Sequence, residues 1–177
     1  AYPSYFTPAK FPLLFEPGTK FVYGPNTDWL GLIVKEVTGQ KLGDFLKVNL
    51  FDKIGMSKSK FSLKEDDPHF PMHIRKEDGS FSLNPEYLYD KKAEVHMGGH
   101  GCYLTIGDYL KFLRMWLNKG TSPDTGVQIL TPETCEWAIQ NHLEPGVEFD
   151  FDIAENKFLP DGGPGFGYTI AGMGYAQ

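Results

Sequence analysis

The segment from residue 16 to residue 39 constrains the fold most, because turn residues enclose a short strand and then open a helix. Residues 16–19, Glu-Pro-Gly-Thr, have the composition of a turn. Residues 20–23, Lys-Phe-Val-Tyr, form a β-prone run that ends at Gly24 and Pro25. The pattern therefore predicts that Tyr23 is held between two turns.

An amphipathic helix is predicted directly after these turns. Its apolar residues recur at i, i+3, i+4 and i+7, namely Leu30, Ile33, Val34 and Val37. Asn26 or Thr27 is expected to cap its amino end, and Thr38-Gly39 supplies a stop. We expect one buried face.

The position of Tyr23 suggests that it acts as a catalytic base. A phenol just ahead of a helix lies near backbone N–H groups and the positive end of the helix dipole, which favour its anionic form. Spacing alone leaves two interpretations open and favours a packing role over a catalytic one, because Tyr23 is one of nine tyrosines.

Three further helices and one hairpin are predicted downstream. The second helix ends near Gly55, the third near Gly120 after a capping pair, and the fourth opens at residues 131–133, Thr-Pro-Glu. The residues that define them are Leu42, Phe45, Leu46, Asn49 and Leu50; Thr105 and Asp108 with Tyr109, Phe112, Leu113, Trp116 and Leu117; and Cys135, Ala138, Ile139 and His142. Residues 72–76 and 80–83 are expected to pair around Glu77-Asp78-Gly79.

Composition excludes several classes of function. With 177 residues, 41% of them apolar, the chain can bury a core and reads as one domain or part of one. Its net charge of −6 and lack of a basic stripe argue against a nucleic-acid partner. No apolar run is long enough to span a bilayer. The two cysteines make no disulfide framework, and Cys135 is predicted to be a buried thiol.

The histidines raise the question of a metal site. His69 and His73 are four residues apart, as are His96 and His100, and such pairs ligate zinc when a rigid helix presents them on one face. Pro71 interrupts the first pair, and two glycines interrupt the second. We therefore predict loop or surface histidines and no metal.

Three motifs, taken together, resemble the serine β-lactamase-like superfamily. They are Phe15-Glu-Pro-Gly-Thr with Tyr23 and Asp28-x-Leu-Gly-x-x-Val-x-x-x-Thr-Gly39; Ile54-Gly-Met56; and Gly98-Gly-His-Gly101-x-x-x-Thr105-x-x-Asp108. Similar segments occur in the same order in class C β-lactamases, penicillin-binding proteins, and related esterases and acyltransferases such as the statin-pathway transesterase. The resemblance covers residues 11–170.

The resemblance implies an α+β fold of the β-lactamase/transpeptidase type. Residues 1–177 are expected to form a single partial domain, with a helical region and part of an antiparallel sheet. It also implies that a serine attacks an acyl carbonyl while a Ser-x-x-Lys lysine and a tyrosine, here Tyr23, manage the proton. A phenol with a pKa of about 10 needs cationic neighbours to act as a base, and a serine hydroxyl needs such a base.

Two further residues are candidates for substrate contact. The Gly-Gly-x-Gly turn lies near the active-site rim in the family, so His100 is expected either to touch substrate or to be an ordinary loop residue. Class C enzymes carry Tyr-x-Asn, whereas Pro25 holds the third place here and Asn26 the fourth. Asn26 is thus either a substrate contact or a helix cap. The spacing is closer to the esterase and acyltransferase branch.

The expected nucleophile is not found where the family places it. A Ser-x-x-Lys motif should precede the tyrosine by about a hundred residues, and only twenty-two residues precede Tyr23. Ser57 and Lys60 match the letters but follow the tyrosine and lead into a polar connection, so we do not expect them to act. A Lys/His/Trp-x-Gly strand would follow residues 165–172. We therefore expect a fragment that is inactive alone.

The predicted activity of the parent protein is ester hydrolysis or transesterification through an acyl-enzyme. Its partners are expected to be a small-molecule ester, thioester or amide, with no cofactor. Two alternatives stay open: a non-catalytic binding module or pseudoenzyme on the same fold, and a β-lactam-hydrolysing enzyme. The oligomeric state and the compartment are not encoded in these motifs, although the cytoplasm is favoured.

Overall fold

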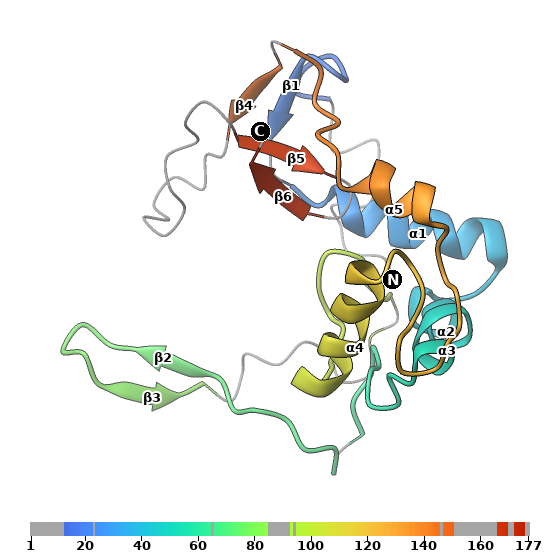
Figure 1. Cartoon of the computed structure of the whole chain (residues 1–177). Coiled ribbons are helices and arrows are strands. Elements are labelled where there is room, and N and C mark those ends of the chain that lie inside the picture. Colours follow the sequence, from blue (N-terminus) through green and yellow to red (C-terminus); the bar gives the residue numbers. More distant parts are fainter. Residues whose placement is uncertain are drawn as a thin grey trace.

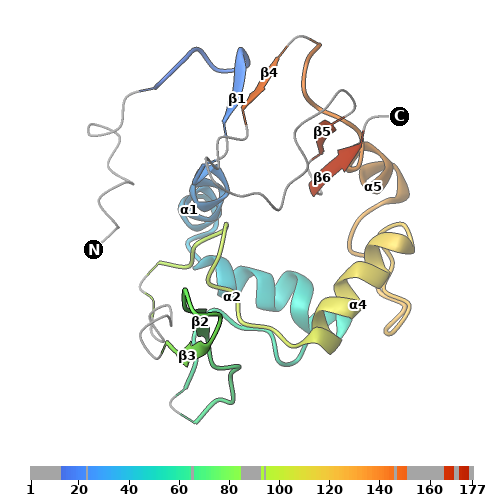
Figure 2. The same cartoon turned by 90° about the vertical axis from the view of Figure 1, so that its left-hand side faces the viewer.

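The computed structural model describes residues 13–22, 24–64, 66–84, 93, 95–145, 147–150, 166–169 and 172–175. The fold is α+β, as predicted; β1, β4, β5 and β6 lie at the top of Figure 1, and the β2–β3 hairpin projects separately at the lower left (Figures 1 and 2). The helical elements are α1 (Asn26–Thr38), α2 (Leu42–Leu46), the π-helical turn η3 (Lys47–Phe51), α3 (Asp52–Ile54), α4 (Ile106–Leu117) and α5 (Pro132–Ala138). The strands are β1 (Lys20–Val22), β2 (His73–Arg75), β3 (Phe81–Leu83), β4 (Glu148–Asp150), β5 (Phe166–Thr169) and β6 (Gly172–Tyr175).

The predicted turn, strand and helix are present on both sides of position 23. The Thr19 N–H donates to the Glu16 carbonyl at 3.2 Å, which closes the first turn before β1. Helix α1 ends at Gly39, whose φ of 71° is left-handed and whose N–H donates to the Lys35 carbonyl. Tyr23 itself lies outside the described residues.

The predicted cap of α1 is wrong. Pro25 occupies the N-cap position with φ −79°, and no side chain makes a capping hydrogen bond. The Pro25 carbonyl accepts from the Asp28 N–H at 3.1 Å, so the proline ring holds the backbone where the helix begins. Asn26 is therefore the first helical residue.

The apolar stripe of α1 is also not buried as expected. Leu30, Ile33 and Val37 are each more than half exposed, whereas Asp28 and Gly31 are buried. The helix packs through its small residue, because an ideal Cβ on Gly31 would lie 3.2 Å from the His96 carbonyl oxygen. Close approach of a loop backbone, rather than an apolar face, thus decides which side of α1 is covered.

The core lies where the second predicted helix meets α4. Helix α2, the π-helical turn and α3 run on from one another and end at Gly55, where φ is 76°. This confirms the predicted stop. The buried cluster consists of Phe51, Ile54, Met56, Phe61 and Met115.

Helix α4 contributes a different face from the one predicted. Its capping pair is confirmed, because the Asp108 N–H donates to Thr105 Oγ1 at 3.2 Å. Met115 is the core residue, with Phe112 and Trp116 packed beside it. Three residues predicted to be on the buried face are exposed instead, namely Tyr109, Leu113 and Leu117.

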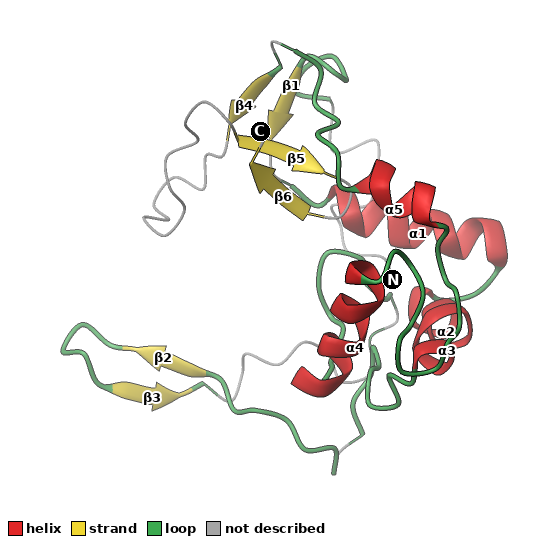
Figure 3. Cartoon of the chain, viewed as in Figure 1, coloured by secondary structure: helices red, strands yellow, loops and turns green. Residues whose placement is uncertain are grey.

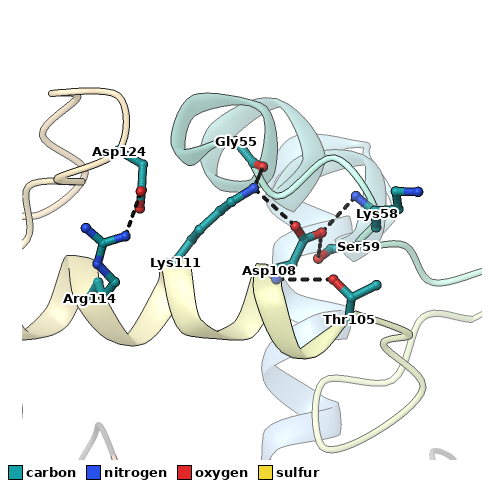
Figure 4. Close-up of polar contacts among 8 residues, drawn as sticks. All are labelled: Gly55, Lys58, Ser59, Thr105, Asp108, Lys111, Arg114 and Asp124. Carbon is teal, nitrogen blue, oxygen red and sulfur yellow. Dashed lines mark hydrogen bonds and ion pairs between the residues drawn. The ribbon is translucent and has the colours of Figure 1, made fainter.

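A buried carboxylate joins α4 to the loop that follows α3 (Figure 4). Asp108 Oδ2 accepts from the Lys58 N–H at 2.8 Å and from the Ser59 hydroxyl at 3.1 Å. Lys111 Nζ lies 3.4 Å from Asp108 Oδ1 and also donates to the Gly55 carbonyl. Because hydrogen bonds to a charged acceptor are stronger than neutral ones, this network ties the two helices together.

Helix α5 is confirmed in part. Thr131 caps it by accepting from the Thr134 N–H at 3.2 Å, and Cys135 and Ala138 are buried as predicted. Burial raises the pKa of the Cys135 thiol. Ile139 and His142 lie beyond the helix end and are exposed, so the predicted face was too long.

The strands of the described residues form three pairs (Figure 3). Strands β2 and β3 form the predicted antiparallel hairpin, with His73 opposite Leu83 and a left-handed glycine, Gly79, in the turn. Strands β5 and β6 are also antiparallel. Strands β1 and β4 pair in parallel, with Lys20 opposite Glu148. This parallel pair was not predicted, because the sequence led us to expect only part of an antiparallel sheet.

Replacing Gly120 with alanine is expected to destabilise the complete protein more than replacing Gly126. Both have left-handed φ, 87° and 73°, so each variant loses about 1–2 kcal/mol of conformational preference. A Cβ on Gly120 would also lie 2.2 Å from the Leu130 carbonyl oxygen, whereas a Cβ on Gly126 would have no heavy atom of another residue within 4 Å, apart from its chain neighbours. We expect about 1–3 kcal/mol of additional loss, measured by denaturant unfolding. Equal losses would contradict the packing described for this turn.

Candidate active-site region

The amino end of α1 meets the Gly98–His100 loop. The Gly99 N–H donates to Asp28 Oδ1 at 2.7 Å, across 71 residues of sequence. The structure therefore places the segment after Tyr23 beside the segment that contains His100. Two motifs that were linked only by resemblance are in direct contact.

Two glycines permit this approach. An ideal Cβ on Gly98 would lie 2.1 Å from the Thr27 carbonyl oxygen, and one on Gly99 would lie 3.1 Å from Asp28 Oδ1. The first distance is far below any real carbon–oxygen contact, so a side chain at Gly98 would displace the loop from the helix. The glycines are required by the distance between the two backbones.

His100 directly follows Gly99 in the chain, and its ring lies near the same carboxylate. Its Nδ1 lies 3.9 Å from Asp28 Oδ1, and the side chain is 38% exposed. That distance is too long for a hydrogen bond, but the pair attracts when the imidazole is protonated. Asp28 is thus the shared neighbour of Gly99 and His100.

The structure treats the three predicted site residues differently. Asn26 is exposed on the first turn of α1, two positions from Asp28, and His100 is part of the contact itself. Tyr23 lies outside the described residues, so its predicted role stays a prediction. Asp28 was not among the predicted site residues. The sequence signal for it was an acidic residue in the first turn of a helix, three positions before the buried Gly31.

His96 anchors the other side of the same loop. Its Nδ1 accepts from the Gly43 N–H at 2.9 Å, near the amino end of α2, and its ring stacks on Phe61 at 5.1 Å between centroids. Burial, followed by the nearby Lys41 ammonium, lowers the pKa of His96, while Asp44 acts in the opposite direction. A neutral Nδ1 is what this hydrogen bond requires.

Neither histidine pair is presented by a helix. His69 and His73 are exposed, and each Nδ1 lies near a backbone carbonyl two residues earlier. Within the described ranges, no three His, Cys, Asp or Glu side chains are grouped so that they could hold a metal ion. Cys102 is half-buried, and burial raises the pKa of its thiol to about 11, which disfavours the reactive thiolate.

The Ser57-x-x-Lys60 match lies in a turn. Ser57 is exposed and precedes no helix, and Lys60 is held by an ion pair between its Nζ and Asp67 Oδ1 at 2.7 Å. The Lys60 backbone pairs with Tyr103 in both directions. Its ammonium is therefore directed at a carboxylate within the connection rather than at a serine hydroxyl.

No helix within the described part of the chain is long and apolar enough to cross a membrane.

Comparisons with known proteins identify the family of the chain. The family model described as Beta-lactamase matches residues 7–176. Lovastatin esterase of Penicillium rubens is 33% identical over 142 residues, covering 76% of this chain and 34% of that protein. Monacolin J acid methylbutanoyltransferase of Aspergillus terreus is 28% identical over 142 residues, covering 77% and 33%. The chain thus spans about a third of the length of the curated relatives it matches.

Solved structures show the same relationship. A simvastatin synthase variant from Aspergillus terreus superposes with a TM-score of 0.66 at 29% identity, covering 76% of this chain and 32% of that one. A penicillin-binding protein from Bacillus halodurans has a TM-score of 0.63 at 20% identity, covering 94% and 44%. At that identity the likeness concerns the fold alone.

The stability of the complete protein is expected to fall at mildly acidic pH through His96. Because its pKa is lowered from 6.5 in the folded state, the unfolded chain takes up the proton first; the contribution is full above pH 6.5 and is lost as pH falls through the folded pKa. His96→Asn keeps an acceptor for Gly43 but does not titrate. Its loss of stability between about pH 7.5 and about pH 5 should be smaller than that of the parent protein.

The matched control is His73→Asn, at an exposed strand position. Urea unfolding at each pH measures the difference. A pH profile that His73→Asn flattens as much as His96→Asn would contradict the assignment.

Proposed function

The chain belongs to the beta-lactamase family, and from that premise we propose that the complete protein is a serine esterase or acyltransferase that works through an acyl-enzyme. A curated esterase and a curated acyltransferase are among its relatives, which supports acyl transfer as the reaction class. The proposal concerns the complete protein.

One observation carries the proposal furthest. The segment immediately after Tyr23 is held against the Gly98–His100 loop by the 2.7 Å bond between Asp28 and Gly99. A site needs its proton-transfer group and its substrate contacts in fixed relative positions, because misplacement by about 1 Å can cost about 100-fold in rate. This contact supplies such a fixed frame next to the tyrosine motif.

Tyr23 is assigned the role of general base. In the proposed reaction, the nucleophilic serine loses its proton to the tyrosine and lysine pair as its oxygen attacks the acyl carbonyl, and the leaving alcohol or thiol takes a proton back. Ser57 and Lys60 are not assigned these roles, since Lys60 is paired with Asp67. We place the serine and its lysine elsewhere in the complete protein.

Asn26 and His100 are assigned to substrate contact. Both residues are exposed, and both flank the Asp28–Gly99 bond, Asn26 on the helix and His100 on the loop. An amide and an imidazole can each donate a hydrogen bond to a carbonyl oxygen of a small-molecule ester, thioester or amide. The spacing of Asn26 from Tyr23 supports ester chemistry over lactam chemistry.

Tyr23→Phe in the complete protein is expected to lower the acylation rate by about 100-fold or more, because the hydroxyl is removed while the ring is kept. Burst kinetics with a chromogenic ester measure that rate. Tyr109→Phe is the matched control, since Tyr109 is an exposed residue of α4. An unchanged acylation rate in Tyr23→Phe would reduce Tyr23 to a structural residue, and a parent protein without any burst would favour a binding module.

Ser57→Ala is expected to leave activity of the complete protein within about twofold, because an exposed turn residue away from the reacting groups changes stability by no more than about 0.5 kcal/mol. Ser59→Ala, which removes the bond to Asp108, serves as the structural comparison. Labelling by a fluorophosphonate probe reports the nucleophile. Loss of labelling in Ser57→Ala alone would overturn our placement of the serine.

A further inference from the structure

Asp28 carries an inference that deepens the proposed function and rests on it. We propose that Asp28 is a positioning residue, which holds the Gly98–His100 loop against α1 and thereby sets the direction of the His100 ring. Asp28 is only 4% exposed, and its Oδ1 is the acceptor for the Gly99 N–H at 2.7 Å. Burial of a carboxylate is costly unless it is compensated, so its placement needs an explanation.

The compensation comes from the two segments that it joins. Asp28 is the third residue of α1, where the helix dipole favours a negative charge. The Gly99 N–H supplies a charge-assisted hydrogen bond, and the His100 ring supplies a positive neighbour when it is protonated. The carboxylate therefore stabilises the observed position of the loop against α1.

The same oxygen reaches both loop residues. Asp28 Oδ1 lies 2.7 Å from the Gly99 nitrogen and 3.9 Å from His100 Nδ1. Fixing the Gly99 backbone sets where the next Cα lies, and attraction at Nδ1 sets how the ring turns. In the proposed role, the fixed backbone and the attraction at Nδ1 of the protonated ring together bias the direction in which Nε2 points.

The glycines make the arrangement sensitive to Asp28. Gly98 lies against the Thr27 carbonyl without room for a side chain. The glycine permits the loop to approach α1, but the absence of a side chain does not by itself hold the loop there. The Asp28–Gly99 hydrogen bond, in contrast, is attractive and joins the two segments directly. Its loss should therefore release the loop and disorient His100.

Asp108 provides a matched control within the same chain. It is also buried, also the third residue of its helix, and also accepts a backbone N–H from a distant loop, that of Lys58. Its side-chain partners are Ser59 and Lys111, neither of which belongs to the Gly98–His100 loop. Asp108 variants thus report the cost of losing a buried helix-end carboxylate without the proposed role.

The first experiment measures hydrogen exchange of the complete protein, a readout that does not need activity. Asp28→Ala should raise the exchange rate at residues 98–101 by about 10-fold or more relative to the parent, because opening of the loop no longer breaks a hydrogen bond. Asp28→Asn keeps an acceptor oxygen and should protect these amides within about threefold of the parent. Asp108→Ala should leave them unchanged. Unaltered exchange in Asp28→Ala would overturn the loop-holding role.

The second experiment is a double-mutant cycle on ester turnover. Asp28→Ala should lower kcat/KM by about 10-fold or more, chiefly through KM, while Asp28→Asn restores most of it. In a His100→Ala background, Asp28→Ala should cost less than about twofold further, because its effect runs through His100. Full additivity of the two variants, or an equal loss in Asp108→Ala, would overturn the proposal.

The two experiments separate failure of this inference from failure of the proposed function. If the parent protein forms no acyl-enzyme, the proposed function fails, and the exchange experiment alone decides whether Asp28 holds the loop. If acylation occurs and the cycle is additive, the proposed function stands and only the role of Asp28 is refuted.

Discussion

The contact between Asp28 and Gly99 is the interaction on which the candidate site depends. It joins the first turn of α1 to a loop 71 residues away, and it does so at 2.7 Å from a buried carboxylate. Such a bond is strong because the acceptor is charged and shielded from water. Asn26 and His100 lie on either side of it, so their separation is set by one hydrogen bond and two glycines.

The same loop is anchored a second time on α2. His96 accepts from the Gly43 N–H, and an ideal Cβ on Gly43 would lie only 2.7 Å from the His96 ring. The loop that starts near His96 therefore ties α2 to α1, and both junctions use a glycine that leaves no room for a side chain. The imidazole of His96 is the acceptor at one junction, and the carboxylate of Asp28 is the acceptor at the other.

The apolar core lies at a different junction, between α2–α3 and α4. Phe51, Ile54 and Met115 bury the junction of α2–α3 with α4, and Asp108 fastens that junction with a second buried carboxylate. In contrast, the apolar residues of α1 stay largely exposed. Within the described residues, Gly31 rather than a large side chain faces the loop, so the backbones of α1 and the loop approach closely there.

The sequence by itself determined the elements whose signals are local. Left-handed glycines identified the carboxyl ends of α1 and α3, a capping pair identified the start of α4, and turn residues identified the β2–β3 hairpin, because these signals depend on neighbours a few residues apart. Motifs in a fixed order identified the family. Only the tertiary structure decided which face of α1 is buried, that β1 pairs in parallel with β4, and that Asp28 meets Gly99. Those outcomes depend on how closely backbone segments far apart in the sequence approach one another, and the spacing of apolar residues along a helix carries no information about that distance.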